Sequence, residues 1–167
     1  MDAQGKYLAL FGMLFCFSLA TVKAVDCPNG WVDGSSVEMG CLGYYSNYFI
    51  NWTEAQDYCN NLPHDSHLVE IKNQDQQDFL VSLLLSGEID AVTMFIGLFK
   101  PPNGHRNWTW AWSMESANFT SWYPSEPTGD GNFAFIHQDY GYDWLDTDEK
   151  TSPPMEPEDA LCQFFPY

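Results

Sequence analysis

The residues of this chain that could bind a cation or a polar ligand are concentrated in its C-terminal third. Between Asp139 and Asp159 there are eight acidic residues and one lysine. Carboxylate and carbonyl oxygens are the ligands that calcium prefers, so this region could hold a hard cation. A solvated acidic loop is equally consistent with the same composition. The carboxylates of this third of the chain include Glu126, in Glu126-Pro127-Thr128, and Asp146, in Trp144-Leu145-Asp146.

Two helices are predicted in the part of the chain that precedes these acids. Asn51 is typical of a helix N-cap and Glu54 stands where a capping box requires it, which predicts a helix over 52–60. After Asn73, apolar residues recur at helical spacing until Gly87, which predicts a second helix ending there.

Short strands are predicted between and after the helices. Leu68 to Ile71 alternates in the manner of a strand, and Met94 to Phe99 is an apolar run of strand length. The remainder of the chain is rich in turns and aromatic residues. Helices followed by short strands and long loops indicate an α+β domain. Long loops of this kind are usually functional or need an external brace.

The first 24 residues have the composition of a secretory signal peptide. Lys6 supplies the basic start, 7–19 is an apolar run too short to span a bilayer, and 22–24 offers a small-residue cleavage site. A retained anchor helix is the alternative. Cleavage would leave 25–167 as one domain, in which no segment is long and apolar enough for a membrane span. We therefore expect a secreted, extracellular protein.

Cleavage would remove Cys16 and leave an even number of cysteines. In a secreted chain, four cysteines predict two disulfides, and the spacing alone leaves three pairings open. These cysteines are Cys27, Cys41, Cys59 and Cys162. The formal net charge of −17 repels phosphate backbones, so nucleic acid is not expected as a partner.

Three N-x-[ST] sequons predict sites of N-glycosylation, at Asn51, Asn107 and Asn118. At Asn51 this role competes with the role of helix cap.

No catalytic motif stands out in the sequence. His64-Asp65-Ser66-His67 spaces two histidines but lacks the glutamate of a zinc protease helix, so local hydrogen bonding is the simpler interpretation. Gly129-Asp130-Gly131 contains an acid and precedes no helix, which argues against phosphate binding. The sequence gives no reason to expect an enzyme.

The order of several segments resembles the C-type lectin domain family. Each is similar to an element of that family, and they follow in its order: Cys27-Pro28-Asn29-Gly30-Trp31 with Cys41, the helix 52–59, Phe95-Ile96-Gly97-Leu98, Trp110-Ala111-Trp112-Ser113, Trp122, Glu126-Pro127 and Cys162. The resemblance implies a C-type lectin-like fold over 25–167, with two helices, two small antiparallel sheets and a long loop region. It also implies the pairings Cys27–Cys41 and Cys59–Cys162.

The same resemblance implies a calcium and carbohydrate site. Family members carry Glu-Pro-Asn or Gln-Pro-Asp and Trp-Asn-Asp, and here Thr128 and Leu145 replace the amide residues. The implied ligands of calcium and carbohydrate are Glu126, Thr128 and Asp146, with a cis bond before Pro127 and with Asp130 and Asn132 as further metal ligands. Thr128 can still offer a hydroxyl or carbonyl oxygen, whereas the Leu145 side chain offers neither an oxygen nor a donor.

Most members carry one more disulfide across the long loop, and this chain has Phe133 at one position and no cysteine over 147–150. Without this disulfide, we expect a looser loop that is braced by aromatic packing of Phe133 and Phe135. The leading hypothesis is a secreted lectin that binds glycans or glycoconjugates with calcium as cofactor. The alternative is a calcium-independent module for protein ligands. The sequence does not distinguish these two binding functions from a purely structural role.

Overall fold

The computed structural model describes residues 26–49, 51–102, 107–148 and 158–166. In chain order the elements are β1 Val32–Asp33, η1 Ser35–Val37, β2 Cys41–Phe49, α1 Trp52–Asn60, β3 His67–Leu68, α2 Gln74–Ser86, β4 Thr93–Phe99, β5 Thr109–Trp110, β6 Phe133–His137, η2 Gln138–Tyr140, β7 Trp144–Thr147 and β8 Glu158–Phe164. The two longer helices, α1 and α2, precede β4 in the chain and are separated by the short strand β3.

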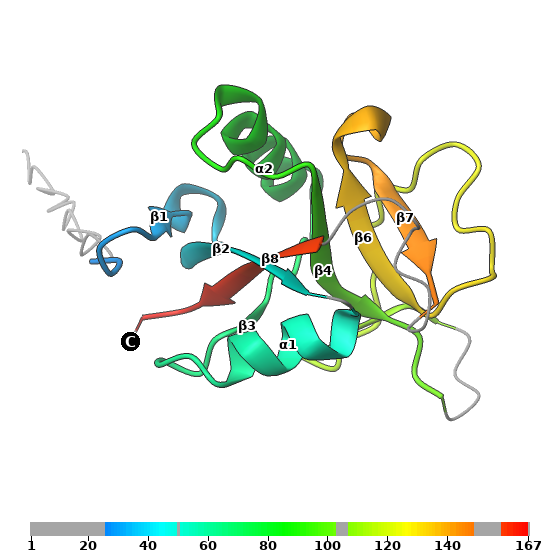
Figure 1. Ribbon diagram of the computed structural model, residues 1–167, viewed down its shortest axis with the longest axis horizontal. Coiled ribbons are helices and arrows are strands. Elements are labelled where there is room, and N and C mark those ends of the chain that lie inside the picture. The colour runs from blue at the N-terminus through cyan, green and yellow to red at the C-terminus, as the bar shows by residue number, and fades with distance from the viewer. Residues whose placement is uncertain (1–25, 50, 103–106, 149–157, 167) are drawn as a thin grey trace, which may run out of the picture.

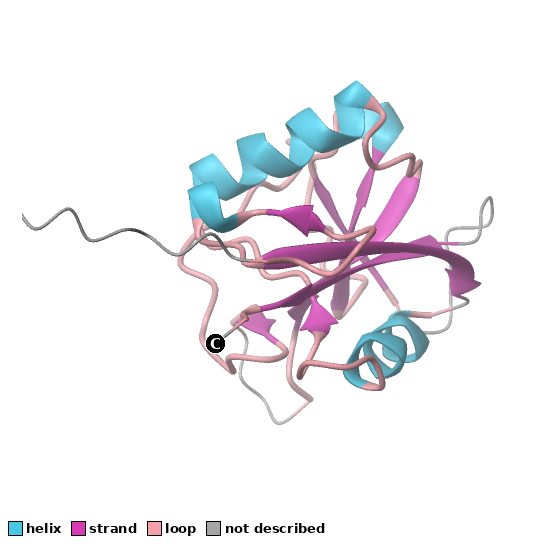
Figure 2. Ribbon diagram, turned by 90° about the vertical axis from the view of Figure 1, so that its left-hand side faces the viewer, coloured by secondary structure: helices cyan, strands magenta, loops and turns pink. Residues whose placement is uncertain are grey.

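The strands form one mixed sheet in the order β1-β2-β8-β4-β6-β7, with β3 paired to β8 and β5 paired to β4. All these pairs are antiparallel except β4 with β8, where Met94 faces Asp159. The resemblance implied two small antiparallel sheets, and this parallel contact joins their strands into one sheet. Figures 1 and 2 show α1 and α2 on opposite sides of the central strands, so the α+β prediction is confirmed.

Both predicted helices are present, and Asn51 caps the first of them as predicted. The side chain of Asn51 accepts a hydrogen bond from the Glu54 amide at 2.8 Å. Asn73 caps α2 in the same way, accepting from the Gln76 amide at 3.0 Å. Gly87 ends α2 with φ of 76°, a left-handed conformation that glycine adopts at little cost.

The predicted strand at Leu68–Ile71 is shorter than expected, since β3 comprises only His67–Leu68. Val69 still bonds to the sheet, because its amide donates to Leu161 and its carbonyl accepts from Gly97. The next amide, that of Glu70, donates instead to the side chain of Gln163 at 3.0 Å. A buried side chain thus takes the place of a backbone partner and ends the regular ladder.

Two apolar clusters occupy the two sides of the sheet. The first contains buried residues of α2, including Leu80, and also Trp144; the second contains buried residues of α1, including Ala55. Disulfides Cys27–Cys41 and Cys59–Cys162 are both formed, which confirms the implied pairing. The second ties α1 to β8 inside the second cluster.

The predicted signal peptide lies outside the described residues. Of the helices in the described ranges, none combines the length and the apolar character that a bilayer span requires. The sequon residues Asn107 and Asn118 are exposed, while Asn51 serves as the cap of α1. Glycosylation of the three asparagines stays a prediction.

Candidate functional site

The segments that carry the candidate site meet at the β6–β7 hairpin. Ala134 of β6 faces Asp146 of β7, and the loop leading into β6 runs past the same strand. The Asn132 amide donates to the Thr147 carbonyl at 2.9 Å, which fixes the end of this loop. A Cβ added to Gly131 would stand 2.3 Å from Thr147 backbone atoms, so the loop lies directly against β7. The Glu126–Pro127 bond is cis, as the resemblance implied.

The Asp146 carboxylate is the centre of this loop and accepts four hydrogen bonds from amides and a hydroxyl of the described loop residues. Its Oδ1 accepts from the Thr128 amide at 2.7 Å and from the Thr128 hydroxyl at 2.8 Å. Its Oδ2 accepts from the amides of Gly129 and Gly131, each at 3.0 Å. A carboxylate with two donors on each oxygen is stabilised as the anion.

The Glu126 carboxyl group accepts hydrogen bonds from backbone amides of the same cluster. Its Oε2 accepts from the Thr128 amide at 3.2 Å and from the Asp146 amide at 3.3 Å. The Thr128 amide is therefore shared by the two carboxyl groups, which places them next to each other. The sequence-predicted residues Glu126, Thr128 and Asp146 thus meet in one cluster.

The environment drives the pKa values of these two acids apart. Burial raises the pKa of Asp146, but hydrogen bonds from Glu126, Thr128 and the loop amides outweigh it and lower the pKa to about 2. Burial and the neighbouring Asp146 raise the pKa of Glu126. The pair therefore favours a charged Asp146, with a proton held more readily by Glu126.

Asp130 and Asn132, the further metal ligands that the resemblance implied, contact the loop through their backbone atoms. Leu145 is buried in the second apolar cluster. Asp130 is exposed, and its amide donates to the Thr128 hydroxyl at 3.3 Å. The Asn132 carbonyl accepts from the Lys100 amide at 2.7 Å, and the Lys100 ammonium stands 3.4 Å from the Gly131 carbonyl.

These contacts do not fit a calcium ion at this loop. Calcium needs six to eight oxygens with free lone pairs, whereas the Asp146 oxygens face N–H and O–H hydrogens. A lysine ammonium also occupies the approach to one loop carbonyl. Within the described ranges there is no group of three or more His, Cys, Asp or Glu side chains arranged to hold a metal.

The loop contacts also include donors that the sequence prediction did not include. In the sequence, Gly129 and Gly131 count only as part of a candidate phosphate loop, which Asp130 and the absence of a following helix argue against, yet their amides hold Asp146. Gly129 has φ of 90°, which lets consecutive amides turn toward one anion. The two glycines close after the candidate residue Thr128 are the feature of the sequence from which these donors could have been predicted. Of the two residues predicted as an aromatic brace, Phe133 stacks on Trp52 with ring centroids 4.9 Å apart, and Phe135 is buried in the second apolar cluster.

Replacing Asp146 by asparagine should destabilise the loop at neutral pH by about 1–2 kcal/mol, because an amide NH₂ meets donors where an oxygen accepted them. The low pKa of Asp146 makes its contribution present above the unfolded value of 3.8 and progressively lost as the pH falls toward about 2. The raised pKa of Glu126 acts in the opposite sense, because it favours the folded state at lower pH.

The measurement is the free energy of unfolding from urea titrations at several pH values. The wild type should converge on Asp146→Asn as the pH falls from 4 toward 2. A constant difference between the two proteins across that range would contradict the charged role of Asp146.

Comparison with known proteins agrees with this fold. The Lectin C-type domain family matches residues 49–154, and the chain belongs to that family. It is 35% identical over 98 residues to snaclec coagulation factor X-activating enzyme light chain 1 of Daboia siamensis, covering 57% of this chain and 64% of that one. It is 32% identical over 120 residues to one subunit of the snaclec anticoagulant protein of Deinagkistrodon acutus, covering 71% and 77% respectively.

Human lithostathine has a similar structure, with a TM-score of 0.70 and 23% identity, over 86% of this chain and 93% of that one. At this identity the likeness concerns the fold alone.

Proposed function

We propose that this protein is an extracellular recognition module that binds a protein partner without calcium. The observation that carries the proposal is the Asp146 carboxylate, which four donors of its own loop satisfy. A loop held in this way needs no ion to keep its shape. Leu145 adds to the argument, since it packs in the apolar interior where a family ligand would supply an amide.

The relatives support a protein partner. Their names describe a light chain and a subunit, that is, members of larger protein assemblies that act in coagulation. That activity belongs to those proteins, and for this chain we propose only the class of ligand. The two disulfides and the predicted signal peptide support an extracellular setting.

The test immobilises this protein and captures partner proteins from the extracellular fluid of the organism that produces it. The capture is done once in calcium and once in EDTA. A partner retained equally in both, and still retained after enzymatic removal of its glycans, would support the proposal. Its affinity would then be measured by calorimetry in EDTA. Capture that EDTA or deglycosylation abolishes would contradict it.

Carbohydrate binding at Glu126, Thr128 and Asp146 is the second candidate. The observation in its favour is the convergence of two carboxyl groups on one amide at the protein surface. A glycan array probed in calcium and in EDTA distinguishes the two proposals. Saturable retention of a glycan, lost in Asp146→Asn, would favour the carbohydrate ligand.

A further inference from the structure

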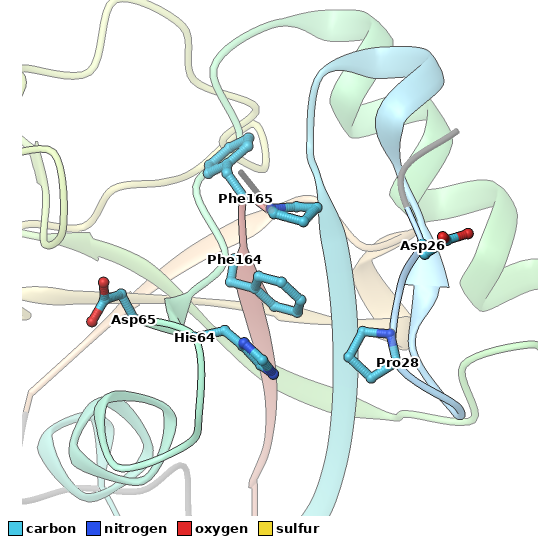
Figure 3. A pocket seen from close by; sticks show the side chains of 7 residues that line it. Asp26, Pro28, His64, Asp65, Phe164 and Phe165 are labelled. Carbon is cyan, nitrogen blue, oxygen red and sulfur yellow. The ribbon is translucent and has the colours of Figure 1, made fainter. Parts of the chain in front are cut away.

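A second candidate site lies where the chain's C-terminal strand ends. A pocket of about 440 Å³ opens between the segment before β1, the loop after α1 and the end of β8. Figure 3 shows six of the residues that line it: Asp26, Pro28, His64, Asp65, Phe164 and Phe165. Its volume lies in the range of about 300–1,000 Å³ typical of ligand pockets. Neither the calcium prediction nor the proposed function makes use of it.

The floor of the pocket is aromatic. The His64 ring stacks on the Phe164 ring, with centroids 4.9 Å apart and planes 23° from parallel. Phe164 is itself buried and packs edge-on against Trp31 at 5.0 Å. Because Phe164 is buried, the ring of this stack that a ligand can reach is the exposed His64 imidazole, which offers a flat π surface.

The walls of the pocket are held by the fold. The Cys27–Cys41 disulfide anchors the segment that carries Asp26 and Pro28. On the other wall, His64 and Asp65 lie in the turn between α1 and β3 with left-handed φ of 74° and 52°. The Ser66 hydroxyl donates to the Pro63 carbonyl across this turn at 2.6 Å. A pocket held on both sides requires little ordering when a ligand enters.

The charge of the pocket is acidic. Asp26 and Asp65 are exposed and stand at opposite edges of the pocket, with the rings of His64 and Phe164 between them, and both carboxylates point outward at the rim (Figure 3). Among the described residues that line it there is no lysine or arginine. A planar cation would complement both features, because guanidinium groups stack on aromatic faces and pair with carboxylates.

Exposed apolar side chains continue from the pocket across the neighbouring surface. Phe165, on the pocket rim, is 39% exposed, and its ring lies 6.0 Å from that of Trp112, which is 47% exposed. Met114 follows in the same turn and is 64% exposed. Exposed Trp, Phe and Met side chains beside a pocket for one anchoring side chain are usual components of a protein-binding surface.

We infer that this pocket binds an arginine side chain of the partner protein, with Phe165, Trp112 and Met114 contacting apolar residues beside that arginine. The inference rests on the proposed function, since it names the surface by which a protein partner is recognised. It places recognition at the C-terminal end of β8 and not at the loop that holds Asp146.

The first test uses N-acetyl-L-argininamide as the probe, with the uncharged N-acetyl-L-citrullinamide as its matched control, in EDTA. NMR titration should show saturable shifts of His64, Asp65 and Phe165 with the arginine probe. Affinity for the citrulline probe should be about tenfold weaker, as should the affinity of Asp26→Asn/Asp65→Asn for the arginine probe. Both aspartates are exposed, so an unchanged thermal midpoint will show that this variant folds.

A matched variant distinguishes binding of the arginine probe in this pocket from its general electrostatic attraction to an acidic protein. Glu88→Gln/Asp139→Asn removes the same charge at exposed positions that do not line the pocket. It should keep the wild-type affinity for the arginine probe. Equal weakening in both double variants, or shifts spread over the whole acidic surface, would overturn the inference.

The second test uses the partner recovered by calcium-independent capture. Asp26→Asn/Asp65→Asn and Phe165→Ala should each weaken its binding about tenfold or more in EDTA. Unchanged binding would overturn the pocket inference and leave the proposed function standing. Loss of capture of the wild-type protein in EDTA would instead reject the proposed function, whatever the pocket does.

Discussion

Replacing both Cys59 and Cys162 by alanine should lower the free energy of unfolding by about 4–5 kcal/mol. The two residues are 103 positions apart, and in the chain-entropy account a cross-link over a loop of that length restricts the unfolded chain by this amount. Both side chains are fully buried between α1 and β8. Since a domain of this size is stable by about 5–15 kcal/mol, the variant should unfold at a much lower temperature.

The matched control is the second disulfide. Cys27 and Cys41 are only 14 positions apart, so replacing them by alanine should cost about 3 kcal/mol. Denaturant unfolding of the two double variants gives the comparison. An equal or larger loss for Cys27→Ala/Cys41→Ala would contradict the account of Cys59–Cys162 as the principal staple.

Replacing Trp144 by alanine should cost about 3–5 kcal/mol, the second large effect. Trp144 is fully buried, and its ring meets Trp110, Phe119 and Trp122 edge-on with centroids 5.7–5.8 Å apart. Its indole N–H donates to Gln77 at 2.9 Å. Truncation would leave a large cavity and an unpaired buried acceptor in the same place.

Two further variants isolate these causes in urea unfolding measurements. Trp144→Phe keeps most of the ring but leaves the Gln77 acceptor unpaired, and should cost less than Trp144→Ala. Trp112→Ala removes an indole that is 47% exposed and should also cost less. If Trp144→Ala proved no more harmful than Trp112→Ala, the packing described around β7 would be wrong.

The position of Trp144 also determines what β7 presents at the site. Side chains alternate along a strand, and the next residue, Leu145, enters the opposite apolar cluster. Asp146 then follows at the end of the hairpin, where the loop amides reach it. The interior packing of Trp144 and Leu145 therefore sets the register of β7. This register places the Asp146 carboxylate within hydrogen-bond distance of Thr128.

Local features of the sequence were sufficient to predict much of the fold. Asn51, Asn73 and Gly87 mark helix ends through their own backbone and side-chain preferences, and they do so in the structure. The short β3 could not be predicted in this way. It ends where Gln163, far away in the chain, takes the Glu70 amide.

The sequence also predicted which acids meet in the candidate site, but not what holds them. Glu126 and Asp146 are identified by their place in a family pattern. The four donors to Asp146 depend on loop backbone angles that no residue type specifies, apart from the freedom of Gly129. The pocket beside Phe164 has the same origin, because its walls come from three distant parts of the chain.

The most direct test of the central claim is the thermal unfolding midpoint in EDTA and in about 10 mM calcium, well above the roughly millimolar dissociation constants of weak extracellular sites. The hydrogen bonds to Asp146 predict the same midpoint in both. A midpoint that rises with calcium in the wild type, and not in Asp146→Asn, would show that an ion binds at the loop and would contradict this account.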